Sequence, residues 1–447
     1  MNRLASTLMW IVAAVALGAI AAWPFYLRSA ANAARIAALP TPAPVAADSM
    51  NRDKLITFWE RADAQHRPGD TLSAAHLSAE YLQRYRERAD IGDVVRALAV
   101  SQRGAHASRY RDAGAEVSWA SALVALHRFR DALAVTKHLE RLVPGDPAMR
   151  VREASIDLEL GRYDEAKRVI DLLAADPQTR TDDGLAFDTL VAREDELTGH
   201  LAAARRRFER VTAFADARFD APAQERAWFW FRTGELAFEA GQNEAAIDAE
   251  RRALQRFPGY SEANRMLARV SCSLHRWEEC RAAASAAAAT APYPEVLGYL
   301  ADAQRALGDA SGGAQTEDLI ASVERVGNTQ RVSDRLLAIY YAEHGTHLED
   351  AYRIARRELD VRDDIFTEDT LAWCAAMTGR WDEARRRSRL ALRFDTENAL
   401  LQYHAGIIAL HGADRVGAKR RLGRALALNP QFHPRYADDA RAALAGL

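Results

Sequence analysis

The sequence predicts an all-α protein built as a solenoid of stacked helical hairpins, and three observations predict it. Long stretches mix Ala, Leu, Glu and Arg with little Val or Ile, a composition that favours helix over strand. One short phrase recurs at a fixed period, since Phe129 to Tyr163 is 34 residues and Asn243 to Trp277 is again 34. Prolines end many of the repeating segments, and they are Pro144, Pro177, Pro258, Pro292 and Pro430. Such a period is expected to stack each helical unit on the next.

An apolar run without charge extends from Leu4 to Ala22, before the repeating part of the chain. A helix of this length spans roughly 28 Å, which matches the hydrocarbon core of a bilayer. The aromatic cluster that follows at residues 23–26 is typical of the membrane interface. We therefore expect one transmembrane helix within an anchor or signal segment at residues 1–28. The alternative interpretation is a signal peptide that is cleaved.

The next segment, residues 29–50, is rich in Pro and Ala, and its alternating prolines favour an extended polyproline stalk. The folded body is expected at residues 51–447. Arg3 on one side of the apolar run nearly balances Arg28 and Arg35 on the other, so the charge bias sets the orientation only weakly. A short tail before a large body favours a signal anchor, with the body outside the cytoplasm.

The repeated phrase consists of Gly or His, one residue, an aromatic or apolar residue, two polar residues and Ala. Its clearest copies run from Gly161 to Ala166 and from Gly379 to Ala384. Looser copies begin at His127, Gly199, Gly241 and His275. We expect the Gly or His to lie in the turn of a helical hairpin. The aromatic residue would plug the hinge, and the Ala would let the second helix approach the first closely.

On these residues the chain resembles the tetratricopeptide repeat family, whose units of about 34 residues are antiparallel helix pairs stacked in a right-handed superhelix. The units are expected at residues 78–111, 113–146, 147–180, 185–218, 227–260, 261–294, 294–327, 332–365, 365–398 and 399–432. Asn51–Gln65 and His433–Leu447 would cap the two ends. The last units are similar to those of bacterial tetratricopeptide proteins.

The charge balance and the absence of catalytic motifs exclude several classes of function. With 60 basic and 62 acidic residues, the chain lacks the basic excess of a nucleic-acid-binding protein. It contains neither a Gly-rich phosphate loop nor a nucleophile elbow. The repeats leave no room for a separate catalytic domain. We therefore expect no enzyme activity, no cofactor and no small-molecule substrate.

Histidine and cysteine spacing gives no metal motif. The closest cluster is Glu343, His344 and His347, at a predicted hairpin turn where His is common, so we expect no metal there. No Cys-x-x-Cys pair occurs among the three cysteines. Cys272 and Cys280 are expected to be two small buried thiols, and a disulfide between them is the alternative.

The family resemblance implies that the first helix of each unit lines a concave groove where partners bind. Trp228, Phe231 and Phe238 share one helix stripe with Glu235, because their spacings are three, four and three residues. Aromatic residues and Arg are enriched at binding hot spots. The expected groove residues are Trp228, Phe231, Glu235, Phe238, Arg265, Arg269, Tyr340, Trp373 and Tyr403. The alternative is that several of these aromatics pack between helices, as is expected for Trp230.

These expectations together predict a membrane-tethered scaffold that binds partner proteins or peptides in its groove. The expected location is a bacterial inner membrane, with one membrane pass and a periplasmic body. If the signal is cleaved, the body would instead be secreted to the periplasm. One alternative function is a structural component of an envelope export or polysaccharide secretion assembly. Another is an accessory subunit of an enzyme at the cytoplasmic face.

Overall fold

The structure is a computed structural model that describes residues 47–65, 71–176, 184–218, 220–330 and 335–447. Apart from residues 217–218, these residues fall within one compact unit, formed by Pro44–Asp216 and Asp220–Leu447. All of the regular elements in the described ranges are α-helices. The apolar run from Leu4 to Ala22 lies outside these ranges. None of the helices that the structure does describe is both long and apolar enough to span a bilayer.

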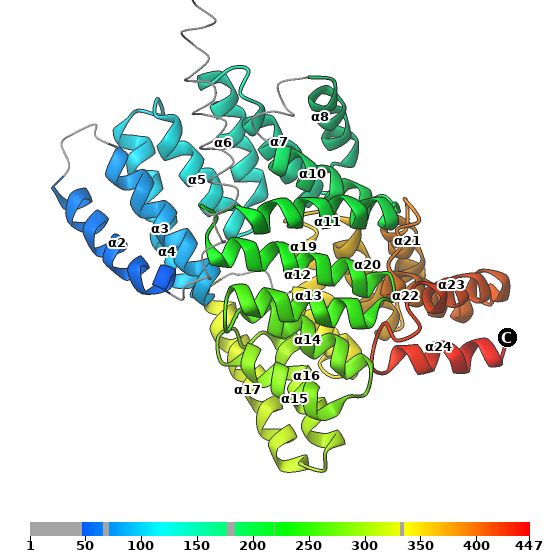
Figure 1. Cartoon of the computed structure of the whole chain (residues 1–447). Helices are drawn as coiled ribbons and strands as arrows, with labels where there is room; N and C mark the ends of the chain where they lie inside the picture. The colour runs from blue at the N-terminus through cyan, green and yellow to red at the C-terminus, as the bar shows by residue number, and fades with distance from the viewer. Residues whose placement is uncertain (1–46, 66–70, 177–183, 219, 331–334) are drawn as a thin grey trace, which may run out of the picture. The chain divides into compact units, whose positions relative to one another are not determined.

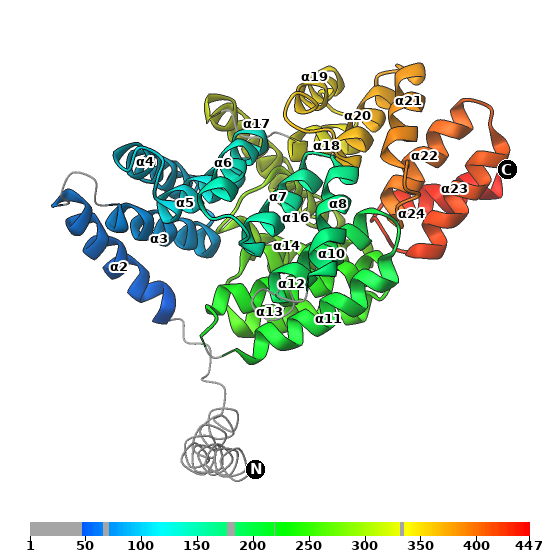
Figure 2. The same ribbon diagram turned by 90° about the horizontal axis from the view of Figure 1, so that it is seen from above.

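Consecutive helices pair as antiparallel hairpins, which stack side by side (Figures 1 and 2). The first hairpins are α3 (Leu72–Arg88) with α4 (Ile91–Ala107), α5 (Ala113–Ala125) with α6 (Phe129–Leu142), α7 (Pro147–Glu159) with α8 (Tyr163–Ala175), and α10 (Gly184–Leu197) with α11 (Leu201–Ala217). The central ones are α12 (Ala223–Glu239) with α13 (Asn243–Arg256), α14 (Ser261–Ser273) with α15 (Trp277–Ala288), and α16 (Pro294–Ala306) with α17 (Ala310–Gln330). The last are α18 (Arg335–His344) with α19 (Leu348–Glu358), α20 (Ile365–Met377) with α21 (Trp381–Ala391), and α22 (Ala399–His411) with α23 (Arg415–Leu428). The prediction of an all-α hairpin solenoid is thus confirmed.

The repeated phrase forms each hairpin in the expected way. Gly161 and Gly379 have φ angles of 78° and 76°, and His127 and His275 also adopt the left-handed conformation that ends a helix. The phrase alanines Ala166 and Ala384 have no solvent exposure, because the two helices of the hairpin meet there.

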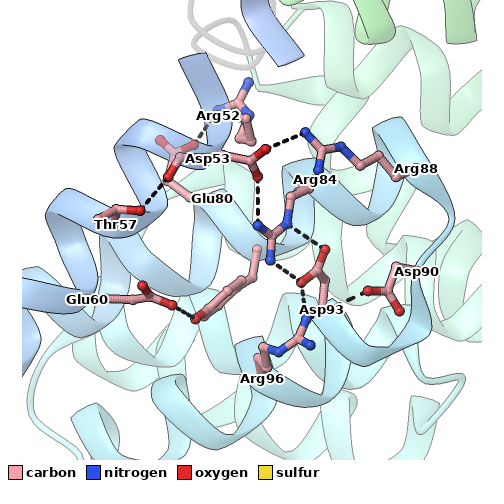
Figure 3. Close-up of polar contacts among 11 residues, drawn as sticks. Arg52, Asp53, Thr57, Glu60, Glu80, Arg84, Arg88, Asp90, Asp93 and Arg96 are labelled. Atoms are coloured by element: carbon pink, nitrogen blue, oxygen red, sulfur yellow. Dashed lines mark hydrogen bonds and ion pairs between the residues drawn. The ribbon is translucent and has the colours of Figure 1, made fainter. Parts of the chain in front are cut away.

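Helix α2 (Ala47–Ala64) covers the N-terminal end of the array and is held there by charged side chains as well as by apolar packing. Figure 3 shows Arg84 of α3 between two carboxylates. Its guanidinium donates to Asp53 on α2 at 2.8 Å and to Asp93 on α4 at 2.6 and 2.8 Å. Hydrogen bonding to Asp93 raises the pKa of Arg84 even though desolvation opposes it, so the ion pair holds these three helices together. At the other end, α24 (Tyr436–Ala445) packs on α23.

Cys272 and Cys280 form a disulfide across the α14–α15 hairpin, with their Cα atoms 5.1 Å apart. The expectation of two free thiols was therefore wrong, and the alternative is what the structure contains. The turn at His275 lies between the two cysteines, so a spacing of eight residues places them on the facing helices α14 and α15 within disulfide range. Cys374 is a buried free thiol.

Three turns in the first part of the array also contact segments of its last part, along a seam that no pattern in the sequence predicted. The turns after α7, α10 and α12 meet the segments before α20, before α22 and after α23. The hydroxyl of Tyr163 accepts a hydrogen bond from the Ile365 amide at 3.1 Å. Thr396 donates to the Leu197 carbonyl at 2.7 Å, and Asn429 donates to the Phe238 carbonyl at 2.7 Å. The concave faces of the two halves of the array therefore face each other across an enclosed interior.

Candidate functional site

The predicted stripe on α12 forms, and two of its aromatic side chains are buried. Phe231 is 5% exposed and Phe238 is 1% exposed, and both belong to the apolar core between α12, α13 and α14. Trp230 packs against the same core, as expected. The rings of Phe231 and Phe238 therefore contact the next hairpin. Helical spacing alone gives no warning of this, because an aromatic stripe has the same spacing whether it faces a partner or the next hairpin.

Arg265 and Arg269 do lie beside this stripe. The Arg265 guanidinium sits 5.6 Å from the centre of the Phe231 ring, and that of Arg269 sits 4.8 Å from the centre of Phe238. Both arginines already have carboxylate partners, however. Arg265 pairs with Glu262 at 2.9 Å, and Arg269 pairs with Glu239 at 3.2 Å. The expected basic wall is consequently neutralised from within the chain.

These pairs belong to a chain of alternating charges that crosses the first helices of three successive hairpins, α10, α12 and α14. Arg193 pairs with Glu196 at 2.9 Å, and Glu196 pairs with Arg232 at 2.6 Å. Arg232 continues to Glu235, which lies 3.7 Å from Arg265. Burial alone would raise the pKa of Glu196, but the two arginines outweigh it and lower that pKa. Breaking one buried pair leaves an uncompensated charge, so these residues stabilise the inner wall.

The predicted aromatic residues of the C-terminal half are also buried. Tyr340, Trp373 and Tyr403 are 6%, 5% and 3% exposed. Trp373 stacks on His404 with ring centres 4.2 Å apart, and Tyr403 stacks on Tyr436 with ring centres 4.7 Å apart. They pack between helices, which was the alternative interpretation for these positions.

The side chains of the predicted histidine cluster at the α18–α19 turn contact different partners and do not share one site. His344 lies 3.6 Å from Asp302, while Glu343 lies 3.6 Å from His433. His347 faces Asp350 at 3.7 Å. In the described ranges, no three His, Cys, Asp or Glu side chains are arranged to hold a metal ion.

The enclosed interior contains a cavity of about 270 Å³. Four of the predicted residues line it, namely Glu235, Arg265, Arg269 and Trp373. A helix is about 10 Å across, so this cavity cannot admit one. The sequence predicted an open concave groove. With the seam in place, the groove residues instead line a polar interior in which most of the charges are paired.

A larger pocket, of about 440 Å³, opens where the end of α3 approaches the beginnings of α12, α14 and α16. We call it the aromatic pocket, because Tyr85, Trp228, Tyr260 and Tyr293 line it together with Gln83, Arg86 and Gln224. Gln83 donates to Gln224 at 3.3 Å, which in turn donates to the Tyr260 hydroxyl at 3.3 Å. Of the predicted site residues, only Trp228 lies here.

The aromatic pocket occurs where the first helices of three successive hairpins lack a capping side chain. Asp112, Asp146 and Asn398 cap other hairpins by accepting a hydrogen bond from a first-turn amide. The matching positions before α12, α14 and α16 are Pro222, Tyr260 and Tyr293, and none makes a side-chain cap. Replacing a capping side chain costs about 1 kcal/mol.

Sequence reasoning missed Tyr85, Arg86, Tyr260 and Tyr293. A signal was present for two of them, because Tyr260 and Tyr293 stand at the capping position of consecutive units, where Asp or Asn would be favoured. Nothing marked Tyr85 and Arg86. Their position in the pocket depends on how the N-terminal hairpin approaches α12, which no local pattern encodes.

No family model matches the chain, and no curated protein matches it. Among solved structures, it is similar to a chain in the crystal structure of the APC/C hetero-tetramer Cut9-Hcn1, at 15% identity and a TM-score of 0.45. That match covers 89% of this chain and 68% of the other. It is also similar to yeast Tom70, at 11% identity and a TM-score of 0.34, over 83% of this chain and 96% of that one. At these values the likeness does not extend to function.

Proposed function

We propose that this chain is a non-catalytic scaffold that binds a segment of a partner protein in the aromatic pocket. The observation that supports this most is the gathering of Tyr85, Trp228 and Tyr293 around the pocket of about 440 Å³, with Tyr293 at a helix beginning that lacks a cap. Tyr, Trp and Arg are the residue types that dominate binding hot spots. The inner groove is a poorer candidate, because its arginines are paired and its volume is small.

The scaffold is proposed to be tethered to a membrane by the apolar run from Leu4 to Ala22, with its body in the periplasm. The Cys272–Cys280 disulfide supports this location, because structural disulfides persist in oxidising compartments and are rare in a reducing cytoplasm. Extraction of membranes with alkaline carbonate tests the tether, and full-length protein is expected in the pellet. A mature protein that begins near residue 22 or 32 would instead support a cleaved signal and a free periplasmic body.

Photo-crosslinking in intact cells tests partner binding directly. A photoreactive residue at position 293 is expected to give discrete adducts with a partner. The same residue at Arg251, which is exposed on α13, serves as the control. Adducts from position 293 should disappear when Trp228→Ala is added. Equal adducts from both positions, or none from position 293, would argue against the pocket as the partner site.

A structural role in an envelope export assembly is the second candidate. The seam favours it, because a closed array with a paired interior behaves as a rigid body, and a bridging component requires rigidity. The crosslinking experiment separates the two candidates. A scaffold would give adducts in which the captured partner is a soluble protein, whereas an export component would give stable adducts with membrane-embedded transport proteins.

A further inference from the structure

The hydrogen-bonding groups of the aromatic pocket indicate what kind of partner segment it takes, and this inference rests on the proposed function. Within the described residues, the hydroxyls of Tyr85 and Tyr293 have no hydrogen-bond partner. Arg86 makes one hydrogen bond, to the side chain of Gln83 at 3.2 Å, and no ion pair. The guanidinium is exposed to the pocket, yet the surrounding atoms desolvate it enough to lower its pKa. The pocket therefore offers several donors that lack acceptors.

Acceptors in the pocket are already engaged. Glu262 accepts from Arg265 at 2.9 Å, and the Gln224 carbonyl oxygen accepts from Gln83 at 3.3 Å. Glu225 also has a partner. A ligand that brings many acceptors and few donors thus matches the pocket better than one that brings donors.

The aromatic rings come from different elements and are anchored outside the pocket. Trp228 packs edge-on against Phe229 with ring centres 4.9 Å apart. Tyr260 packs edge-on against Phe231 and Phe257, at 6.3 and 6.1 Å between centres. Trp228, which is partly buried, thus gives a wall whose position does not depend on the ligand, while Tyr260, at 3% exposed, supports the pocket from the core; a wall fixed in advance lowers the entropy lost on binding.

We propose that the aromatic pocket binds a proline-rich segment of a partner protein in the polyproline II conformation. Such a segment has no internal hydrogen bonds, so its carbonyl groups are free to accept from Tyr85, Tyr293 and Arg86. Proline lacks a backbone N–H and brings no donor of its own. Its rings pack on aromatic side chains, and the preformed conformation loses little entropy when it binds.

Two other ligand classes fit less well. A helical ligand pairs its own carbonyl groups, so it would leave the donors of the pocket unmatched. An acidic peptide would be attracted by Arg86 but would approach the carboxylates of Glu225 and Glu262 in the same wall. A neutral ligand rich in acceptors avoids this repulsion.

Binding of synthetic peptides to the full-length chain in detergent micelles, measured by titration calorimetry, tests the proposal. The probe is a nine-residue peptide of proline and alanine with both ends blocked. The comparison peptides replace every proline with serine, or every alanine with glutamate. The proline peptide is expected to bind at least tenfold more tightly than the serine peptide. Equal affinity for these two, or tighter binding of the glutamate peptide, would overturn the proposal.

Matched variants locate the binding. The double variant Tyr85→Phe with Tyr293→Phe removes only two hydroxyls, so the fold should persist, and affinity for the proline peptide should fall several-fold. Tyr110→Phe, at an exposed tyrosine outside the pocket, should leave affinity unchanged. Equal affinity of the double variant and the control would contradict the donor argument. If the peptides fail while crosslinks from position 293 persist, the ligand class is wrong and the proposed function stands.

Discussion

The two clearest copies of the repeated phrase, Gly161–Ala166 and Gly379–Ala384, share five of six residues in identical places and adopt the same hairpin turn, yet they have different surroundings. A Cβ atom at Gly161 would overlap the carbonyl oxygen of Asp363, whereas a Cβ atom at Gly379 would meet no atom within 4 Å. The first glycine therefore serves both a turn and the seam, and the second serves only a turn.

This difference shows that the hairpin and the seam depend on different residues of the chain. The phrase determines the hairpin, because its glycine, aromatic residue and alanine act within one unit. The seam depends on residues about 200 positions away, and the phrase carries no trace of them. The same local sequence is thus compatible with a turn that packs against a distant segment and with a turn that meets no other segment.

The largest expected effect tests what the two copies share. Ala166→Trp and Ala384→Trp each force a large side chain between two helices that meet without solvent. Each should cost several kcal/mol, more than the roughly 1–3 kcal/mol of ordinary overpacking. Arg386→Trp, at an exposed position of α21, is the control and should cost little. Equal urea midpoints for Ala384→Trp and Arg386→Trp would contradict the register of the hairpins.

The second effect tests what the copies do not share. Gly379→Ala should cost about 1 kcal/mol, because alanine disfavours a positive φ. Gly161→Ala carries that cost and also pushes against the Asp363 backbone, which should add about 1–3 kcal/mol. Urea unfolding of both variants measures the difference. If the two glycines tolerate alanine equally well, residue 161 does not contact the segment before α20 in solution.

A third difference between the copies is a buried charge. Asp157 stands four residues before Gly161, and Ala375 stands at the matching place before Gly379. Burial raises the pKa of Asp157 to about 6. Because the folded pKa lies above the unfolded one, the charged form destabilises the fold above pH 6, and this loss is relieved as pH falls to 4. Asp157→Asn should therefore stabilise by about 2 kcal/mol at pH 8 and by almost nothing at pH 4.

Urea midpoints of Asp157→Asn at these two pH values measure that gain. Asp164→Asn, at an exposed position of α8, is the control and should show no such pH dependence. A gain in stability that is the same at both pH values would mean that burial does not raise the pKa of Asp157.

The smallest expected effect concerns a single hydrogen bond in the seam. Thr396→Val leaves the Leu197 carbonyl without its donor and should cost about 1 kcal/mol. Thr378→Val is the matched control, because Thr378 bonds within its own helix, to the Cys374 carbonyl at 2.8 Å. A smaller loss for Thr396→Val than for Thr378→Val would indicate that the seam contributes no stability there.

Much of the fold followed from sequence because the fold is repeated. The glycine or histidine, the phrase alanine and the apolar residue seven positions later recur in many units, and residues such as Leu139 and Leu173 are buried as that pattern requires. Helix α3 begins at Leu72, six residues before its predicted unit, because none of the copies of the repeated phrase lies in that unit.

The candidate site followed far less from sequence. The stripe of Trp228, Phe231 and Phe238 was identified correctly, but helical spacing does not say whether a stripe faces a partner or the next hairpin. The charges of Arg265 and Arg269 were identified without their partners. Glu262 stands three residues before Arg265 on the same helix, where helical spacing could have indicated the pair, whereas Glu239 belongs to the preceding hairpin. Ion pairs between hairpins and the contacts of the seam form only in the assembled solenoid.

The distance between two spin labels tests the closure of the solenoid most directly. Labels at Asp164 and Asp360 would occupy exposed positions three residues from Gly161 and from Asp363, on the two sides of the seam. The Cys272–Cys280 disulfide and the buried Cys374 leave the added cysteines as the reactive thiols. Pulsed electron paramagnetic resonance of the labelled protein is expected to give one short and narrow distance distribution. A broad distribution centred at a long distance would show that the array is open in solution and would contradict the closed interior.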